Sequence, residues 1–567
     1  MTALISNTSS SKLFRTISAL VVLITLSFLL ACDKKEEQAA TQTSEKKAQV
    51  VTSQVNLVDY VPADALYYTS IPFAKLSADL RALFATQMTQ AVKSKTGIFS
   101  SIDNANAPDA ARVALGFIYL AAQIATNAEF PSEQLTYVSF PKIEQTWSAK
   151  AAILMTPPAN TSVNDYYDSF SKILPSFGFI AKPNNSEQNN PSPAYANAEG
   201  LELFLSKNDT VVQISGFIPN EVAPATSKLS DSSNFKSALA NSKTSSSEHL
   251  AMFVDIAAAV KNFGIEDKIR AEAANAQSKD SEQALKFINS LQAGILLMDL
   301  NSPVEAQKSR LLITPTSQGK ETLKEFDQLA KFSPDLTIDS GTIGMMSLNL
   351  DLLNLPILSS LKQEATPAMA MFPQLANLKV LSIKAGEQTT PAAAALAMPI
   401  PMPNIVAAIR FSDAQSGKTL LDGLKSMLPG LQCQASTDLK SRAVELCPTP
   451  MGFKLANRIE GNSIFLGTEE ALKSDGSEGT SQSTPAEISA NIAVLYMDNE
   501  KMAKVAKESL SKNPNVTPEM LAQFSNSPLE SSWSAVNIGS NGISVNVTAK
   551  FAKNAASQAN KVPASVE

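Results

Sequence analysis

The side chains that most often carry out chemistry are scarce in this chain of 567 residues, which has three cysteines and one histidine, His249. Cys433 and Cys447 form an even pair that is not spaced as C-x-x-C, and Cys32 stands apart near the N-terminus. This favours a structural disulfide between Cys433 and Cys447 over a redox-active or metal-binding pair. One histidine is too few for a multi-histidine metal site, so we predict no metal and no cofactor.

One segment ends like a phosphate-binding loop, Ser416-Gly417-Lys418-Thr419. In such a loop a second glycine five residues earlier lets the backbone wrap the phosphates, and here Ser412 occupies that position. The segment Ser317-Gln318-Gly319-Lys320 also lacks the full motif. We therefore predict that both segments begin helices and that neither binds a nucleotide.

The serine, histidine and carboxylate residues do not form a recognisable catalytic motif. Lys95-Thr96-Gly97 and Ser169-Phe170-Ser171-Lys172 are similar to elements of serine penicillin-interactive enzymes, but the order of the two elements is reversed. We expect His249 to be solvated or to cap a turn, since it lies between a serine-rich turn and an apolar strand. Glu469 and Glu470 are expected on a solvated edge. The sequence predicts no catalytic residue, and we do not expect an enzyme.

The N-terminus has the order of an export signal. Lys12 and Arg15 precede an apolar run from Ile17 to Leu30, which is short for a membrane span. Leu29-Leu30-Ala31-Cys32 resembles the lipobox of bacterial lipoproteins. That resemblance implies cleavage before Cys32 and acylation of this residue, and two or more acyl chains anchor a protein stably in a membrane.

The residues after Cys32 predict a tether. Residues 33–54 are mostly charged or small and polar, so they should be disordered and span on the order of 25 Å as a coil. Asp33 favours the inner membrane under enterobacterial sorting rules, although the outer membrane stays open. Loss of Lys12 and Arg15 with the signal changes the net charge from −6 to −8. Without a basic patch, we predict no nucleic-acid partner.

The rest of the chain repeats a strand-and-helix pattern. In one version an apolar or alternating strand precedes a polar break and a helix, at Leu66–Pro72, Leu250–Asp255, Ile343–Asn349 and Val494–Asp498. In a second version a strand and a polar turn precede an amphipathic helix, at Ala151–Thr156, Leu311–Thr314 and Val406–Phe411, with a weaker copy at Val545–Phe551. The pattern predicts an α+β fold of four related modules, with mostly antiparallel sheets and helices packed on one face. The modules can also be grouped as two larger domains of two modules each.

The start of the folded part carries a second resemblance. Val61-Pro62-Ala63-Asp64-Ala65-Leu66-Tyr67-Tyr68 is similar to the opening of a group of uncharacterised bacterial exported proteins, which implies an α+β fold and no catalytic residue. The predicted organisation is a signal peptide (1–31), a lipidated cysteine with its tether (32–57), and modules at 58–240, 241–335, 336–480 and 481–567.

Two segments could provide an apolar binding surface. Ala110–Leu120 is apolar around most of a helix, which usually indicates core packing but could line a lipid groove. Pro391–Pro403 lacks the polarity of a loop and, if exposed, would suit a partner or an apolar ligand. We therefore expect a protein anchored to the membrane through Cys32, facing the periplasm, that binds another envelope protein. The alternatives are a carrier or chaperone for a lipid or another apolar ligand, and a hydrolase with an unrecognised site.

Overall fold

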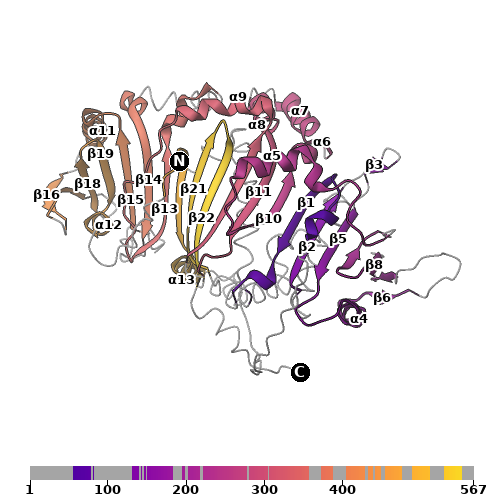
Figure 1. Cartoon of the computed structure of the whole chain (residues 1–567). Helices are drawn as coiled ribbons and strands as arrows, with labels where there is room; N and C mark the ends of the chain where they lie inside the picture. Colours follow the sequence, from indigo (N-terminus) through magenta and orange to yellow (C-terminus); the bar gives the residue numbers. More distant parts are fainter. Residues whose placement is uncertain are drawn as a thin grey trace.

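The structure, a computed structural model, is dominated by one continuous antiparallel sheet of twenty strands, and Figure 1 shows it running across the molecule. It describes the chain from residue 55 to residue 551, with gaps of which the longest are 82–119, 121–130, 183–193, 357–371, 387–403, 475–487 and 511–528. Within the described residues no helix is long and apolar enough to cross a bilayer.

The twenty strands follow one linear order, and every pairing between neighbours is antiparallel. From the first edge to the middle, the strands are β6 (Ile180–Ala181), β7 (Ala194–Ala196), β8 (Glu202–Lys207), β9 (Val212–Ser215), β5 (Lys150–Thr156), β2 (Glu133–Ser139), β1 (Ala65–Ile71), β10 (Glu248–Asp255), β11 (Leu291–Asp299) and β12 (Gln307–Pro315). From the middle to the second edge they are β22 (Gly542–Phe551), β21 (Leu529–Gly539), β20 (Ala493–Asp498), β13 (Thr342–Asn349), β14 (Leu378–Gly386), β15 (Asn404–Phe411), β19 (Ser463–Thr468), β18 (Lys454–Glu460), β17 (Ala443–Pro448) and β16 (Gln434–Thr437). A separate hairpin pairs β3 (Lys142–Ile143) with β4 (Thr146–Trp147).

The two halves of this sheet have the same connectivity. In the first half the chain runs β1-β2-β5, leaves for the edge, returns through β9 to β5, and then adds β10, β11 and β12 on the other side of β1. In the second half β13 to β22 repeat these steps in the same order. The halves join where β12 pairs with its counterpart β22. The sheet is therefore two ten-stranded units joined through equivalent strands, whereas the four-module division remains a prediction.

The register of the junction shows how the halves are related. The pairings from β1 through β10 and β11 to β12 can be matched, residue by residue, with those from β13 through β20 and β21 to β22. In this match Arg310 in β12 is the counterpart of Asn546 in β22. These two residues are also directly opposite each other across the β12–β22 pairing. A pseudo-two-fold axis therefore passes through this residue pair.

A glycine is required beside the junction. Gly542 begins β22 with φ +112°, a backbone conformation that side-chain-bearing residues rarely adopt. A Cβ at this position would lie 2.0 Å from the backbone oxygen of Ile313 in β12. The absence of a side chain lets the β21–β22 turn come close to β12.

The described helices of the whole chain are α4 (Val163–Ile173), α5 (Ser233–Ser242), α6 (Ile256–Asn262), α7 (Ile265–Ala276), α8 (Asp280–Ile288), α9 (Ser317–Leu323), α11 (Ala414–Met427), α12 (Glu469–Ser474) and α13 (Asn499–Leu510).

Helices cover both faces of the first half. In β5, Ile153 packs in a cluster with Phe170 of α4, whereas the next residue, Leu154, packs in a cluster with Phe235 of α5. Successive residues of a strand point to opposite faces. The prediction of helices on one face is therefore wrong for this half, although the α+β class and the antiparallel sheet agree with the structure.

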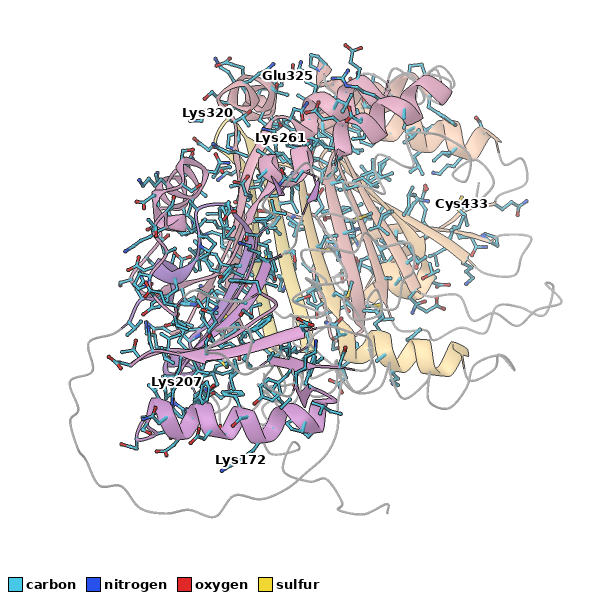
Figure 2. All side chains as sticks on the ribbon, turned by 90° about the vertical axis from the view of Figure 1, so that its right-hand side faces the viewer. Lys172, Lys207, Lys261, Lys320, Glu325 and Cys433 are labelled. Atoms are coloured by element: carbon cyan, nitrogen blue, oxygen red, sulfur yellow. A yellow bond between two sulfur atoms is a disulfide. The ribbon has the colours of Figure 1, made fainter. Side chains whose placement is uncertain are left out.

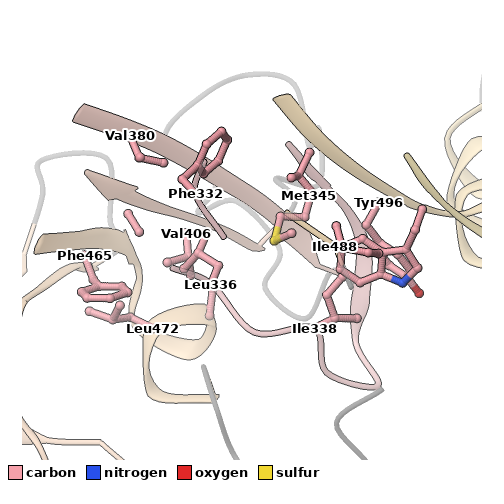
Figure 3. Close-up of a cluster of buried hydrophobic side chains, with 14 of the residues drawn as sticks. Phe332, Leu336, Ile338, Met345, Val380, Val406, Phe465, Leu472, Ile488 and Tyr496 are labelled. Carbon is pink, nitrogen blue, oxygen red and sulfur yellow. The ribbon is translucent and has the colours of Figure 1, made fainter. Parts of the chain in front are cut away.

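The second half has its main core on one face (Figure 3). Met345 of β13 and Tyr496 of β20 point into this core, where the ring of Tyr496 lies 4.8 Å from that of Trp533 between centroids. The segment that precedes β13 covers them with Phe332 and Leu336. This core accounts for one set of alternating residues in β13, β14, β15 and β20 and leaves the other set on the opposite face.

Candidate functional site

An apolar surface lies on that opposite face of the second half. Its residues come from four neighbouring strands, β20, β13, β14 and β15, and alternate with residues that point into the core. We call this surface the open face and define it by Leu495, Met497, Gly344, Met346, Ile383, Ala385, Ile405 and Ala407. All eight residues are apolar and none of them is buried.

The register arranges the open face in two rows across the sheet. In one row Leu495 is opposite Met346, and Met346 is opposite Ile383 on its other side. Ile383 is in turn opposite Ala407. Because directly opposite side chains in antiparallel strands lie about 5 Å apart, these residues form a continuous apolar strip.

The second row has a different shape. It runs from Met497 through Gly344 and Ala385 to Ile405. In this row Gly344 and Ala385, which are both small, lie next to each other between the long side chains of Met497 and Ile405.

The open face exposes more apolar surface than a sheet packed on both sides. Leu495 and Met497 are each 41% exposed, Met346 is 38% exposed and Ile405 is 39% exposed. Beside it, Met502 of α13 is 38% exposed. Monomeric soluble proteins rarely expose a large contiguous apolar patch unless it contacts something else. The open face is therefore the candidate binding surface.

A polar cluster in the first half is the nearest arrangement to a catalytic site. The Ser70 hydroxyl donates to Oε1 of Glu133 at 3.0 Å, and Nε2 of His249 lies 3.1 Å from Ser70 Oγ. Burial, together with the nearby charge of Lys75, lowers the pKa of His249 to about 4, so its ring is neutral at pH 7. Burial raises the pKa of Glu133. The expectation that His249 is solvated or caps a turn is wrong, because it lies within β10, is only half-exposed at most, and has its ring on Ser70 Oγ.

This cluster lacks the access that catalysis requires. Ser70 is 2% exposed, and a serine nucleophile must contact its substrate. The hydroxyl also bridges the ring and the carboxylate, whereas in a catalytic triad the histidine lies between the serine and the acid. We interpret the cluster as a buried hydrogen-bond network that joins β1, β2 and β10.

The sequence motifs have structural roles. α9 and α11 begin at Ser317 and Ala414, which confirms that both phosphate-loop-like segments begin helices. Gly417 packs against β19, where a Cβ would lie 3.1 Å from Ile464 Cγ1. Ser169 lies within α4 and donates to the backbone oxygen of Tyr166.

The remaining predicted residues are placed as follows. The structure joins Cys433 to Cys447 by a disulfide, the pairing that the sequence predicts, and Figure 2 shows Cys433 far from the α4 residue Lys172. Glu469, in the first turn of α12, pairs with Lys473. Among the described residues, no group of three or more histidine, cysteine or acidic side chains could hold a metal ion. Outside the described residues lie Cys32, Lys95–Gly97, Ala110–Tyr119 and Pro391–Pro403.

Sequence reasoning missed the open face, although its strands show a trace of it. The segments Leu378–Gly386, Asn404–Phe411 and Ala493–Asp498 carry apolar residues at both alternating sets of positions. Such a run also occurs in strands buried on both faces. The pattern therefore shows two apolar faces without showing that one of them is uncovered.

Comparisons with protein-family models, with curated proteins and with solved structures found no match.

Proposed function

We propose that this chain is a lipid-anchored, periplasm-facing binding protein of the bacterial cell envelope, and that the open face is the surface with which it binds. The observation that carries the proposal is the exposure of Leu495, Met497, Met346 and Ile405 on one continuous apolar surface. The lipobox-like Cys32 supports the anchoring, and the polar residues 33–54 support a tether.

The energetics favour a partner for this surface. Covering apolar surface contributes about 25 cal/mol per Å² before the costs of association. Tethering helps further, because a protein held near the bilayer meets other envelope proteins at a raised effective concentration.

Localisation is tested with the full chain and its Cys32→Ser variant in cells. We expect the full chain to fractionate with membranes and to incorporate labelled palmitate, and the variant to lose the acyl label. Recovery of unlabelled full chain in the soluble fraction would contradict the anchoring.

Binding is tested by placing a photo-crosslinking residue at position 495 of the full chain in living cells. The matched control places it at Ile180, which is 72% exposed at the opposite end of the sheet. We expect a defined protein adduct from position 495 and not from position 180. An adduct with phospholipid alone would indicate the carrier function instead, and no adduct at position 495 would contradict the binding role.

A further inference from the structure

The first half contains a counterpart of the open face. Matching the registers around β1 and β13 makes Met252 the counterpart of Leu495, and Ala151 the counterpart of Ile405. In the first half these residues are covered, since Met252 is 8% exposed and Ala151 is fully buried. Leu495 and Ile405 are 41% and 39% exposed. These equivalent residues therefore differ in whether the chain covers them, although α11 covers Phe411 and Ile464 farther along the same face of the second half.

Helical segments of the chain itself cover the face in the first half. Leu120, a helical residue in the long connection between β1 and β2, is 3% exposed and packs in one cluster with Ala151 and Ile153. Ala258 and Ala259 of α6 pack against the same cluster.

The second half has less chain available for this purpose. The connection from β1 to β2 spans residues 72–132, whereas the equivalent connection from β13 to β14 spans residues 350–377 and is less than half as long. The counterpart of α6 is α13, since each follows its strand after an aspartate, Asp255 or Asp498, that accepts a backbone hydrogen bond from the helix start. Val260 of α6 is buried, whereas the described side chains of α13 are all partly or fully exposed.

Taking the proposed binding function as its basis, we infer that the open face docks an amphipathic helix of a partner protein, at the place where the first half packs helices of its own chain. The row from Met497 to Ile405 suits a helix, because the small residues Gly344 and Ala385 at its centre leave room for one ridge of side chains. Because the residues of the open face are apolar, the docking side of the partner helix should be apolar, with an acidic residue matching Lys379, which lies farther along β14 on the same face.

The test uses a segment of this chain for which the sequence predicts a helix. The probe is a fluorescent peptide of residues 107–126, which contains Leu120, and the control peptide carries Gly116→Pro, which breaks a helix. Binding to a soluble form of the chain that begins at residue 33, and so lacks Cys32, is measured by fluorescence anisotropy. We expect the helical peptide to bind and the proline peptide to bind at least about tenfold more weakly, which corresponds to 1.4 kcal/mol.

Protein variants locate the binding. Leu495→Gln and Met346→Gln should each weaken binding of the helical peptide by about tenfold, whereas Ile180→Gln, also at an exposed apolar residue, should leave it unchanged. Circular dichroism and melting of each variant show whether it is folded. Because Leu495 and Met346 are already exposed, we expect both variants to keep the wild-type melting temperature.

Five results would overturn the inference. Three concern the peptides: equal binding of the two peptides, no binding of the helical peptide, and binding unaffected by Leu495→Gln. The fourth is flotation of the soluble form with phospholipid vesicles that Leu495→Gln abolishes. The fifth is a dimer that Leu495→Gln dissociates, which would identify a second copy as the occupant. If position 495 crosslinks to a protein in cells while the helical peptide does not bind, the binding function stands and the helical nature of the partner is refuted.

Discussion

Removal of one buried charge should destabilise the second edge of the sheet. Asp438 and Arg458 are 0% and 1% exposed, and their closest charged atoms lie 3.2 Å apart. Asp438 also pairs with Arg442, and the Arg458 guanidinium lies over the ring of Phe465 at 4.3 Å. We predict that Asp438→Asn, which keeps the size of the side chain and removes its charge, leaves Arg442 and Arg458 to share the more exposed carboxylate of Glu460.

The geometry gives the scale of the effect. At 3.2 Å and an effective dielectric constant of about 20, the gross attraction between Asp438 and Arg458 is roughly 5 kcal/mol. Breaking a buried pair by removing one partner usually costs 3–5 kcal/mol, because the remaining charge stays buried. The control is Asp351→Asn, which breaks the more exposed pair with Lys379 and should cost about 1 kcal/mol or less.

Hydrogen exchange of the backbone amides in β16, β17 and β18 measures the loss locally, and urea unfolding measures it for the whole chain. We expect exchange in these strands to accelerate by at least about a hundredfold in Asp438→Asn and to stay close to wild type in Asp351→Asn. Equal protection in the two variants would refute the reasoning. The double variant Asp438→Leu with Arg458→Met should recover much of the loss, since well-packed apolar side chains can replace a buried ion pair.

Three further predictions follow from the described residues. Gly542→Ala should destabilise the chain by more than about 2 kcal/mol, because of its positive φ and the contact with Ile313, and the melting temperature should fall accordingly; an unchanged value would contradict the close approach. Cys433→Ser should cost about 3 kcal/mol in urea unfolding, and the disulfide should protect Cys447 from thiol alkylation before reduction; alkylation of native protein would refute it. The folded-state pKa of His249 is about 4 against an ordinary value of 6.5, so the unfolded chain binds the extra proton first and stability should fall as pH drops from 6.5 to 4. In His249→Gln the free energy of unfolding should fall by roughly 3 kcal/mol less over this pH range than in the wild type. If the free energy of unfolding depends on pH in the same way in both proteins, the ring is not held neutral.

The sequence predicted much of the local structure, because strands and helix starts follow from neighbouring residues. Thr316 caps α9 with its hydroxyl, and Asp413 accepts the backbone hydrogen of Ser416 at the start of α11. The pairing of Cys433 with Cys447 followed from counting cysteines. Each of these features depends on residues that are close in the chain or on a pair without competitors.

Long-range arrangement was beyond the reach of the sequence. The segment Val545–Phe551 showed only a weak copy of the repeat, yet β22 pairs with β12 and joins the halves. His249 was misplaced because the partner that holds it, Ser70, lies far away in the chain. The exposure of Leu495 depends on what the rest of the chain covers, which periodicity in one strand does not show.

At the junction of Arg310 and Asn546, equivalent strands meet across a pseudo-two-fold axis. The single chain therefore has the geometry of a homodimer whose two subunits are covalently joined. In a true homodimer every substitution is present twice, so a surface that is covered in one subunit is covered in both. A single polypeptide is free of that constraint, and its halves can change independently. The first half, which is covered by helices on both faces, can thus maintain the stability of the sheet while the open face of the second half stays exposed.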